Sequence, residues 1–492
     1  MTESDWDATP PSSMPSFIAP APPPIQQGTI WSAPQPSTPQ PPPKGTSGPW
    51  IVAVILVVVI AVVIAAFTWW RQAIGAHPAT PTGQQIQQGS PTNTTPSIER
   101  ASTGVGVYGG SADEFFASLA INGDGSIIAA GSASSSDGDF PVQNSNDTLL
   151  AKLTAQGELV WTASMGGTGN DSFYGVAINA DGTIIAAGST DSVDGDLPVD
   201  AGNGEDALLA KYSADGELIW AKTFGGDGTD SFTAVAISPD GAIVAAGSTS
   251  STSGSFPATG GAQSVLLAKF SPDGDMDWAQ ISGTDGMDDF DTVAVDADGS
   301  IVTAGSIQAT NDAFDPIDSS AGNAVIAKYT SSGQLLWAST FTDGAMATYY
   351  SVTILSDDSV MAAGMTIDQA LLARYSSDGH ELWTTQVADP ANAWFTATSL
   401  TVNDSIVAVG NVLLPNTDTT WVQVAQFSED GQQTWAKTYG GTGDSALWGA
   451  KVTADGNIIA VGSTDSSDGD FPATHGGMDA LVVRLDGNGS LG

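Results

Sequence analysis

The chain has 492 residues, a formal net charge of −42 and no cysteine. A protein this acidic lacks the clustered Lys and Arg side chains that nucleic-acid binding requires, so nucleic acid is excluded as a partner. The absence of cysteine excludes disulfides, thiol nucleophiles and thiolate metal sites.

The first 100 residues divide into three segments of different composition. Residues 1–49 hold 14 of the 27 prolines and predict a disordered Pro-rich tail. Residues 51–70 read IVAVILVVVIAVVIAAFTWW, and a helix of this length spans about 30 Å, the thickness of a hydrocarbon core. We therefore predict a transmembrane helix over 50–70, in contact with the lipid bilayer, and a polar linker over 71–100.

The flanks of the apolar segment give its orientation. Lys44 lies on one side and Arg71 on the other, so the positive-inside rule is nearly balanced. A short tail inside and a large domain outside is the commoner arrangement for a signal anchor. We predict a single-pass protein of the cell membrane, with a cytoplasmic N-terminal tail and residues 101–492 outside.

Residues 101–492 contain a long internal repeat. Its marker is a tryptophan that returns every 46 to 59 residues, at Trp161, Trp220, Trp278, Trp337, Trp383 and Trp435. The second repeat contains four strand-like runs: Ser172–Ile178, Ile184–Ser189, Ala207–Tyr212 and Leu218–Phe224. NADG joins the first two runs and SADG the last two, and Asp-Gly between strands indicates a hairpin. Each repeat is therefore a four-stranded antiparallel meander.

The number of repeats and the two ends of the array predict a closed ring. Gly-rich links begin near residues 109, 166, 225, 283, 342, 388 and 440. The last repeat has only three runs, while Ser102–Tyr108 aligns with the strand that precedes the last link. We predict an all-β, seven-bladed β-propeller of four-stranded antiparallel blades, in which the N-terminal strand completes the last blade.

The repeat resembles a known family. GGTGNDSF, AINADGTIIAAGSTDSVDGDLP and DALLAKYSADGELIW, echoed by GGTGDSAL and STDSSDGDFPATHGGMDALVVRL, look like the bacterial β-propeller repeat family abbreviated SBBP. The resemblance covers essentially residues 101–492. It implies a propeller fold and an exported protein, and it implies no particular activity.

Two charged positions also recur. A base follows the third run in six repeats: Lys152, Lys211, Lys269, Lys328, Arg374 and Arg484. An acid follows Gly-Gly in five: Glu114, Asp171, Asp230, Asp288 and Asp444. The bases could form a ring that binds an anion, or they could pair with these acids inside each blade. We favour the ion pair, because cations in so acidic a chain most often have acidic partners. The repeated Trp is interpreted as packing between blades.

The longer loops contain the candidate metal ligands. Three loops share an Asp-Gly-Asp pattern, and their carboxylates are Asp137 and Asp139; Asp191, Asp194 and Asp196; and Asp465, Asp468 and Asp470. Carboxylates spaced around a glycine can supply several of the oxygens that calcium requires. The alternative is that Asp and Gly are simply good turn residues that keep this face soluble.

The sequence leaves three functions open. The favoured one is a binding module that presents its acidic loop face to a glycan, a wall polymer or a protein. A carbohydrate-active enzyme that uses two loop carboxylates and a passive structural scaffold are the alternatives. A second candidate ligand site is aromatic and consists of Trp394, Trp421 and Trp448, which lie outside the repeat pattern. These tryptophans could instead compensate for the shortened fifth and sixth blades.

Overall fold

The computed structural model describes residues 104–492 apart from short gaps. The gaps are 143–145, 198–203, 260–261, 284–285, 309–313, 315–321, 343–345 and 388–391, with the single residues 416, 418 and 473. The predicted tail, transmembrane helix and linker all lie outside the described residues. Within the described ranges, no helix has the length and apolar character needed to cross a membrane.

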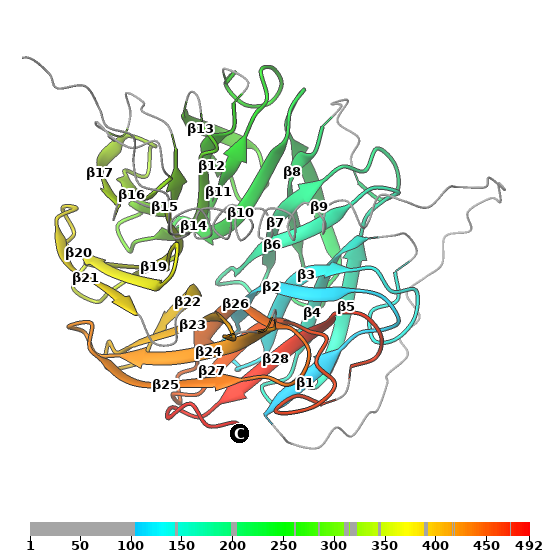
Figure 1. Ribbon diagram of the computed structural model, residues 1–492. Coiled ribbons are helices and arrows are strands. Elements are labelled where there is room, and N and C mark those ends of the chain that lie inside the picture. Colours follow the sequence, from blue (N-terminus) through cyan, green and yellow to red (C-terminus); the bar gives the residue numbers. More distant parts are fainter. Residues whose placement is uncertain are drawn as a thin grey trace, which may run out of the picture. The chain divides into compact units, whose positions relative to one another are not determined.

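The described residues form seven antiparallel sheets of four strands each (Figure 1). Blades 1 to 3 consist of β2 (Glu114–Ile121), β3 (Ile127–Ala133), β4 (Asp147–Leu153) and β5 (Leu159–Met165); β6 (Asp171–Ile178), β7 (Ile184–Thr190), β8 (Asp206–Tyr212) and β9 (Leu218–Phe224); and β10 (Asp230–Ile237), β11 (Ile243–Thr249), β12 (Ser264–Phe270) and β13 (Met276–Ser282). In the second repeat, each predicted strand matches the observed one to within one residue.

The remaining blades have the same order. Blades 4 to 6 consist of β14 (Asp289–Val295), β15 (Ile301–Ile307), β16 (Asn323–Tyr329) and β17 (Leu335–Phe341); β18 (Ala347–Ile354), β19 (Val360–Thr366), β20 (Ala370–Tyr375) and β21 (Glu381–Val387); and β22 (Ala393–Leu400), β23 (Ile406–Leu413), β24 (Thr420–Phe427) and β25 (Gln433–Tyr439). Blade 7 consists of β26 (Ser445–Val452), β27 (Ile458–Thr464), β28 (Asp479–Leu485) and β1 (Val105–Tyr108).

The ring is closed by the N-terminal strand, as the sequence predicts. Strand β1 pairs antiparallel with β28, from Val105 opposite Val483 to Tyr108 opposite Ala480. The first strand of each blade contacts the first strands of both neighbours, and β26 contacts β2. These seven inner strands therefore surround the axis, and the tryptophan strands lie at the rim (Figure 1).

Blades pack on one another through small and aromatic side chains. The second strand of each blade is almost wholly buried, and its Ala and Gly residues permit close approach of neighbouring sheets. Each repeated Trp lies against a turn glycine of the next blade. At Gly216, where φ is +83°, an added Cβ would lie 2.8 Å from the Trp161 ring. The packing interpretation of the repeated Trp is confirmed.

Candidate functional site

The two ends of the propeller differ in their connections. At one end, which we name the turn end, short hairpins join the first strand to the second and the third to the fourth. At the other, which we name the loop end, lie the longer loops between second and third strands and the links between blades. Because loops on a rigid scaffold are the usual place for binding residues, the loop end is the candidate site.

The Lys and Arg residues lie only toward the turn end. The nine Lys and Arg residues of 101–492 are Lys152, Lys211, Lys222, Lys269, Lys328, Arg374, Lys437, Lys451 and Arg484. The six repeated bases precede the last residue of their third strands, next to the turn. Lys222 and Lys437 reach turn residues Asp275 and Ser490, and Lys451 is the penultimate residue of β26. The loop end therefore carries acids without Lys or Arg.

The repeated bases pair with acids of the hairpin turns. Arg374 contacts Asp357 in its own blade at 2.9 Å and Glu429 in the next blade at 3.0 Å. Lys328 contacts Asp296 at 3.4 Å, with both side chains largely buried. The prediction of an ion pair within the blade is thus correct for these bases, but the predicted acidic partners are wrong. The actual acids belong to the turns, because the acids after Gly-Gly lie at the opposite end of the blade.

The acids after Gly-Gly order the loop end instead. Glu114 accepts hydrogen bonds from the backbone N–H groups of Gly110, at 2.9 Å, and Ser135, at 3.0 Å. Asp171 similarly accepts from Gly167 N–H at 3.0 Å. Burial raises the pKa of both carboxyls, while these hydrogen bonds oppose the shift.

The acid predicted for blade 7 is offset by one residue from the equivalent position of the other blades. The sequence predicted Asp444 as the acid that follows Gly-Gly in this blade. In the structure, Ser445 pairs with Thr464 as Asp171 pairs with Thr190, so a serine occupies the position of the buried acid. The error arises because Asp444 directly precedes that position, and the acid motif alone does not specify the strand register.

The predicted calcium ligands contact the links between blades. Asp137 accepts from Ser111 N–H at 2.8 Å, and the equivalent Asp194 and Asp468 accept from Thr168 and Thr442. Asp139 and Asp470 accept from the N–H groups of Gly109 and Gly440, while Asp191 and Asp465 accept from those of Asn170 and Asp444. The Asp196 backbone N–H donates to Gly166 O at 3.1 Å. These loops therefore support the inter-blade links.

In blade 3 the carboxylate that joins loop and link belongs to the link, whereas in the other blades described above it belongs to the loop. It has Ser253-Gly254-Ser255 in place of Asp-Gly-Asp. Asp227, in the link itself, accepts from Thr252 N–H at 2.7 Å and Ser253 N–H at 3.1 Å. The Thr252 and Ser253 hydrogen bonds lower the pKa of Asp227 to about 2. The shared element is thus a carboxylate between loop and link, whichever segment supplies it.

Calcium binding by these loops stays a prediction. In the described part of the chain, no three acidic or histidine side chains are placed to hold a metal ion. If calcium binds the native state, a thermal melt of the full chain should shift upward, by about 2.7 kcal/mol of stability at 100 times the dissociation constant. Chelator should abolish the shift, as should Asp194→Asn combined with Asp468→Asn. An unchanged melt would contradict calcium binding.

The three candidate tryptophans do not share one surface. Trp421 donates from Nε1 to Gly441 O at 2.9 Å, and its ring lies against Gly440. Trp394 pairs with Asn411 of β23, whereas Trp421 pairs with the next residue, Val412. Because successive side chains of a strand alternate between faces, Trp394 and Trp421 lie on opposite faces of the sheet. Trp448 lies at a bulge in inner strand β26 and is 44% exposed. Of the three, Trp448 presents the most open aromatic surface.

Two further acids on an inner strand were missed by sequence reasoning. Asp289 and Asp291 belong to β14, where they contact Gln263 at 3.5 Å and Thr348 at 3.2 Å. Burial raises the pKa of both carboxyls, and their proximity adds to the shift at Asp289. These acids could have been detected in the sequence as a departure from the repeat, because the position of Asp289 is occupied by Ser172 in blade 2.

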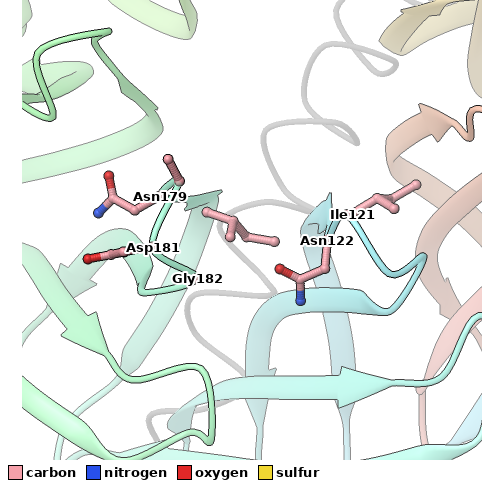
Figure 2. Close-up of a pocket in the computed structure, with 8 residues that line it drawn as sticks. Ile121, Asn122, Asn179, Asp181 and Gly182 are labelled. Carbon is pink, nitrogen blue, oxygen red and sulfur yellow. The ribbon is translucent and has the colours of Figure 1, made fainter.

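A hollow at the turn end lies between blades 1 and 2 (Figure 2). Its lining includes Ile121 and Asn122 from one hairpin, and Ile178, Asn179 and Asp181 from the next. Figure 2 shows the side chains of Asn122 and Asn179 on the two facing turns. Each amide donates to a hydroxyl four residues ahead in its own turn, at 3.0 Å. The hollow is thus shaped by hairpin structure that recurs around the ring.

Comparison with known proteins identifies no family. No family model matches the chain. A stretch of 144 residues is 27% identical to the regulatory protein FlaEY of Caulobacter vibrioides, and it covers 27% of this chain and 15% of that protein. The chain therefore spans well under two thirds of this curated relative.

Solved structures with a similar backbone arrangement have little sequence identity to this chain. Sqt1 from Chaetomium thermophilum is 10% identical, with a TM-score of 0.43, and the match covers 78% of this chain and 99% of that one. The Pan2 WD40 domain of Neurospora crassa is 8% identical, with a TM-score of 0.42, covering 76% and 89% respectively. The propeller assignment rests on the strand pairing of this chain itself.

Proposed function

We propose that this protein is a binding module, anchored in the membrane through residues 50–70, that presents the loop end of its propeller outside the cell. The partner is a protein, glycan or wall polymer with cationic groups. The observation that carries the proposal is the distribution of charge described above. All nine bases of 101–492 lie toward the turn end, while the loop end carries clustered carboxylates.

This distribution supports the binding function. A field of one sign over one end attracts oppositely charged partners and raises their association rate. The loop carboxylates that a glycoside-cleaving enzyme would use accept backbone hydrogen bonds in the inter-blade links. A passive scaffold would use these carboxylates only to support the inter-blade links, and the charge variants below separate that function from binding.

A comparison of matched charge variants tests the proposal. The full chain in detergent is titrated with a lysine-rich peptide and, separately, with a glutamate-rich peptide of the same length. The loop variant combines Asp191→Asn, Asp194→Asn and Asp468→Asn, and the control combines Asp215→Asn, Asp273→Asn and Asp378→Asn at the turn end. The loop variant should lose at least about tenfold in affinity for the basic peptide at low salt.

The control variant carries the same change in net charge, so it should retain most of the affinity. Equal losses in the two variants would mean that binding follows net charge and not the loop end, and the proposal would be wrong. Thermal melts of both variants check that the links between blades remain folded.

A further inference from the structure

Two carboxyl groups meet where the ring closes. Glu114 begins inner strand β2, Asp479 begins β28, and both side chains are fully buried. A Cβ placed on Gly109, in the link from β1 to β2, would lie 2.1 Å from Asp479 Oδ1 and 2.5 Å from Glu114 Oε2. The two oxygens are therefore separated by at most the sum of these distances, 4.6 Å.

The two carboxyls differ in their hydrogen bonds. Both oxygens of Glu114 accept backbone N–H groups, as described above. Asp479 Oδ2 accepts from His475 N–H at 2.6 Å and lies 3.0 Å from His475 Nδ1. Asp479 Oδ1 is buried and has no hydrogen-bond partner. A buried carboxylate oxygen without a hydrogen-bond partner is costly beside a second carboxylate, unless a proton or a cation lies between the two groups.

Two carboxyls also lie around a link glycine at the next two contacts between adjacent blades, which we name seams. A Cβ on Gly166 would lie 2.4 Å from Asp147 Oδ1 and 2.6 Å from Asp171 Oδ2. At Gly225 the corresponding distances are 2.0 Å to Asp206 Oδ1 and 2.7 Å to Asp230 Oδ2. At the following seam, Ser264 stands where the third-strand acid would be. The paired carboxyls therefore belong to the scaffold of blades 7, 1, 2 and 3.

We propose that Asp479 and Glu114 share one proton, carried on Asp479 Oδ1 and donated to Glu114 Oε2, and that this proton makes closure of the propeller sensitive to pH. Glu114 is the acceptor because its oxygens already receive two N–H groups, which favours its ionised form. The proton gives Asp479 Oδ1 a partner and removes one of two adjacent buried charges. The proton relieves this charge without a metal ion between the two oxygens.

The surroundings set the direction of the pH effect. Asp139 accepts from Gly109 N–H and interacts with Asp479 through its charge, Asp113 accepts from Met478 N–H in the adjoining segment, and His475 is the nearby base. Burial raises the pKa of both Glu114 and Asp479. The folded state therefore holds the proton more tightly than the unfolded state does. The stabilisation is complete at low pH and is lost as pH rises through the raised folded pKa.

The location gives this proton a structural consequence. Gly109 connects β1 to β2, and β1 is the strand that closes the ring by pairing with β28. Loss of the proton leaves two negative charges at the point where the two ends of the array meet. We expect β1 to separate from β28 before other strands separate, because closure depends on this one non-local pairing.

The test is the pH dependence of the thermal melt of the full chain between about pH 5 and pH 8. Asp479→Asn replaces the shared proton with an amide N–H that does not titrate. This variant should lessen the wild-type decline in Tm, while the pairs at the other two seams and the buried Asp289 and Asp291 carboxyls keep their contributions, and it should melt higher than wild type at the alkaline end. The infrared carbonyl band of a protonated carboxylic acid should decrease with it.

Two controls separate the proton from other causes. Asp468→Asn changes an exposed loop acid and should leave the pH slope unchanged. His475→Gln keeps the backbone N–H and removes the imidazole, so it should keep the slope if the carboxyl pair titrates. Glu114→Gln provides a second variant of the pair if Asp479→Asn does not fold.

Two results would overturn the proposal. One is a wild-type slope and infrared band that persist unchanged in both pair variants. The other is a rise in wild-type Tm with calcium that is absent in Asp479→Asn, which would place a cation between the carboxyls. Neither result depends on whether the loop end binds a basic peptide, so this inference and the proposed function fail separately.

Discussion

Replacing Lys328 with methionine is expected to destabilise the propeller by about 3 kcal/mol. Lys328 Nζ contacts Asp296 Oδ2 at 3.4 Å, and only 9% and 12% of the two side chains are exposed. Methionine fills a similar volume but leaves the Asp296 carboxylate buried without its counter-charge. Breaking one side of a buried ion pair is far costlier than breaking a surface pair, because the remaining charge has lost its water.

The measurement is urea denaturation of the full chain, with Lys211→Met as the matched control. Lys211 occupies the same position in blade 2, but its Nζ donates to the Pro272 carbonyl at 3.2 Å. Its loss should cost about 1 kcal/mol, the usual contribution of one hydrogen bond. Equal losses for the two variants would mean that packing of the side-chain stem, and not the ion pair, stabilises this position.

The second large effect has the opposite sign: Gln423→Leu should stabilise the domain by about 2 kcal/mol. The Gln423 side chain is fully buried, and neither its amide nitrogen nor its amide oxygen has a hydrogen-bond partner. The equivalent positions, each paired with the second-strand glycine, are Leu149, Leu208, Leu266, Val325, Leu371 and Leu481. Leucine therefore restores the repeat and removes an unsatisfied amide from the core.

A higher denaturation midpoint with an unchanged m-value is the expected result for Gln423→Leu. Asn411→Val is the contrasting control in the same blade. The Asn411 amide accepts from Leu447 N–H at 2.8 Å and donates to Leu447 O at 3.3 Å. Its loss should destabilise the protein, because the Leu447 N–H loses the Asn411 acceptor, whereas Leu447 O still accepts from the Thr396 hydroxyl at 2.7 Å. A loss of stability in Gln423→Leu would show that this amide has a role that the fold alone does not require.

The candidate site was predictable only in part. The sequence correctly placed the acidic loops at one end of the blades, because loop length and turn type follow from local residues. It did not reveal that Asp137, Asp194 and Asp468 would accept hydrogen bonds from links 26 residues away. It also grouped Trp394 and Trp421, which are close in the chain but point to opposite faces of one sheet.

By itself, the sequence determined the blades and their number. Asp-Gly turns, alternating apolar residues and the returning tryptophan are local signals, and the leftover run Ser102–Tyr108 implied closure of the last blade, which β1 makes with β28. The tertiary structure decided which charges meet. Arg374 contacts Glu429 of the next blade, and Glu114 meets Asp479 from the other end of the array. Such partners are set by how neighbouring sheets pack around the axis, and a repeat pattern carries no information about that geometry.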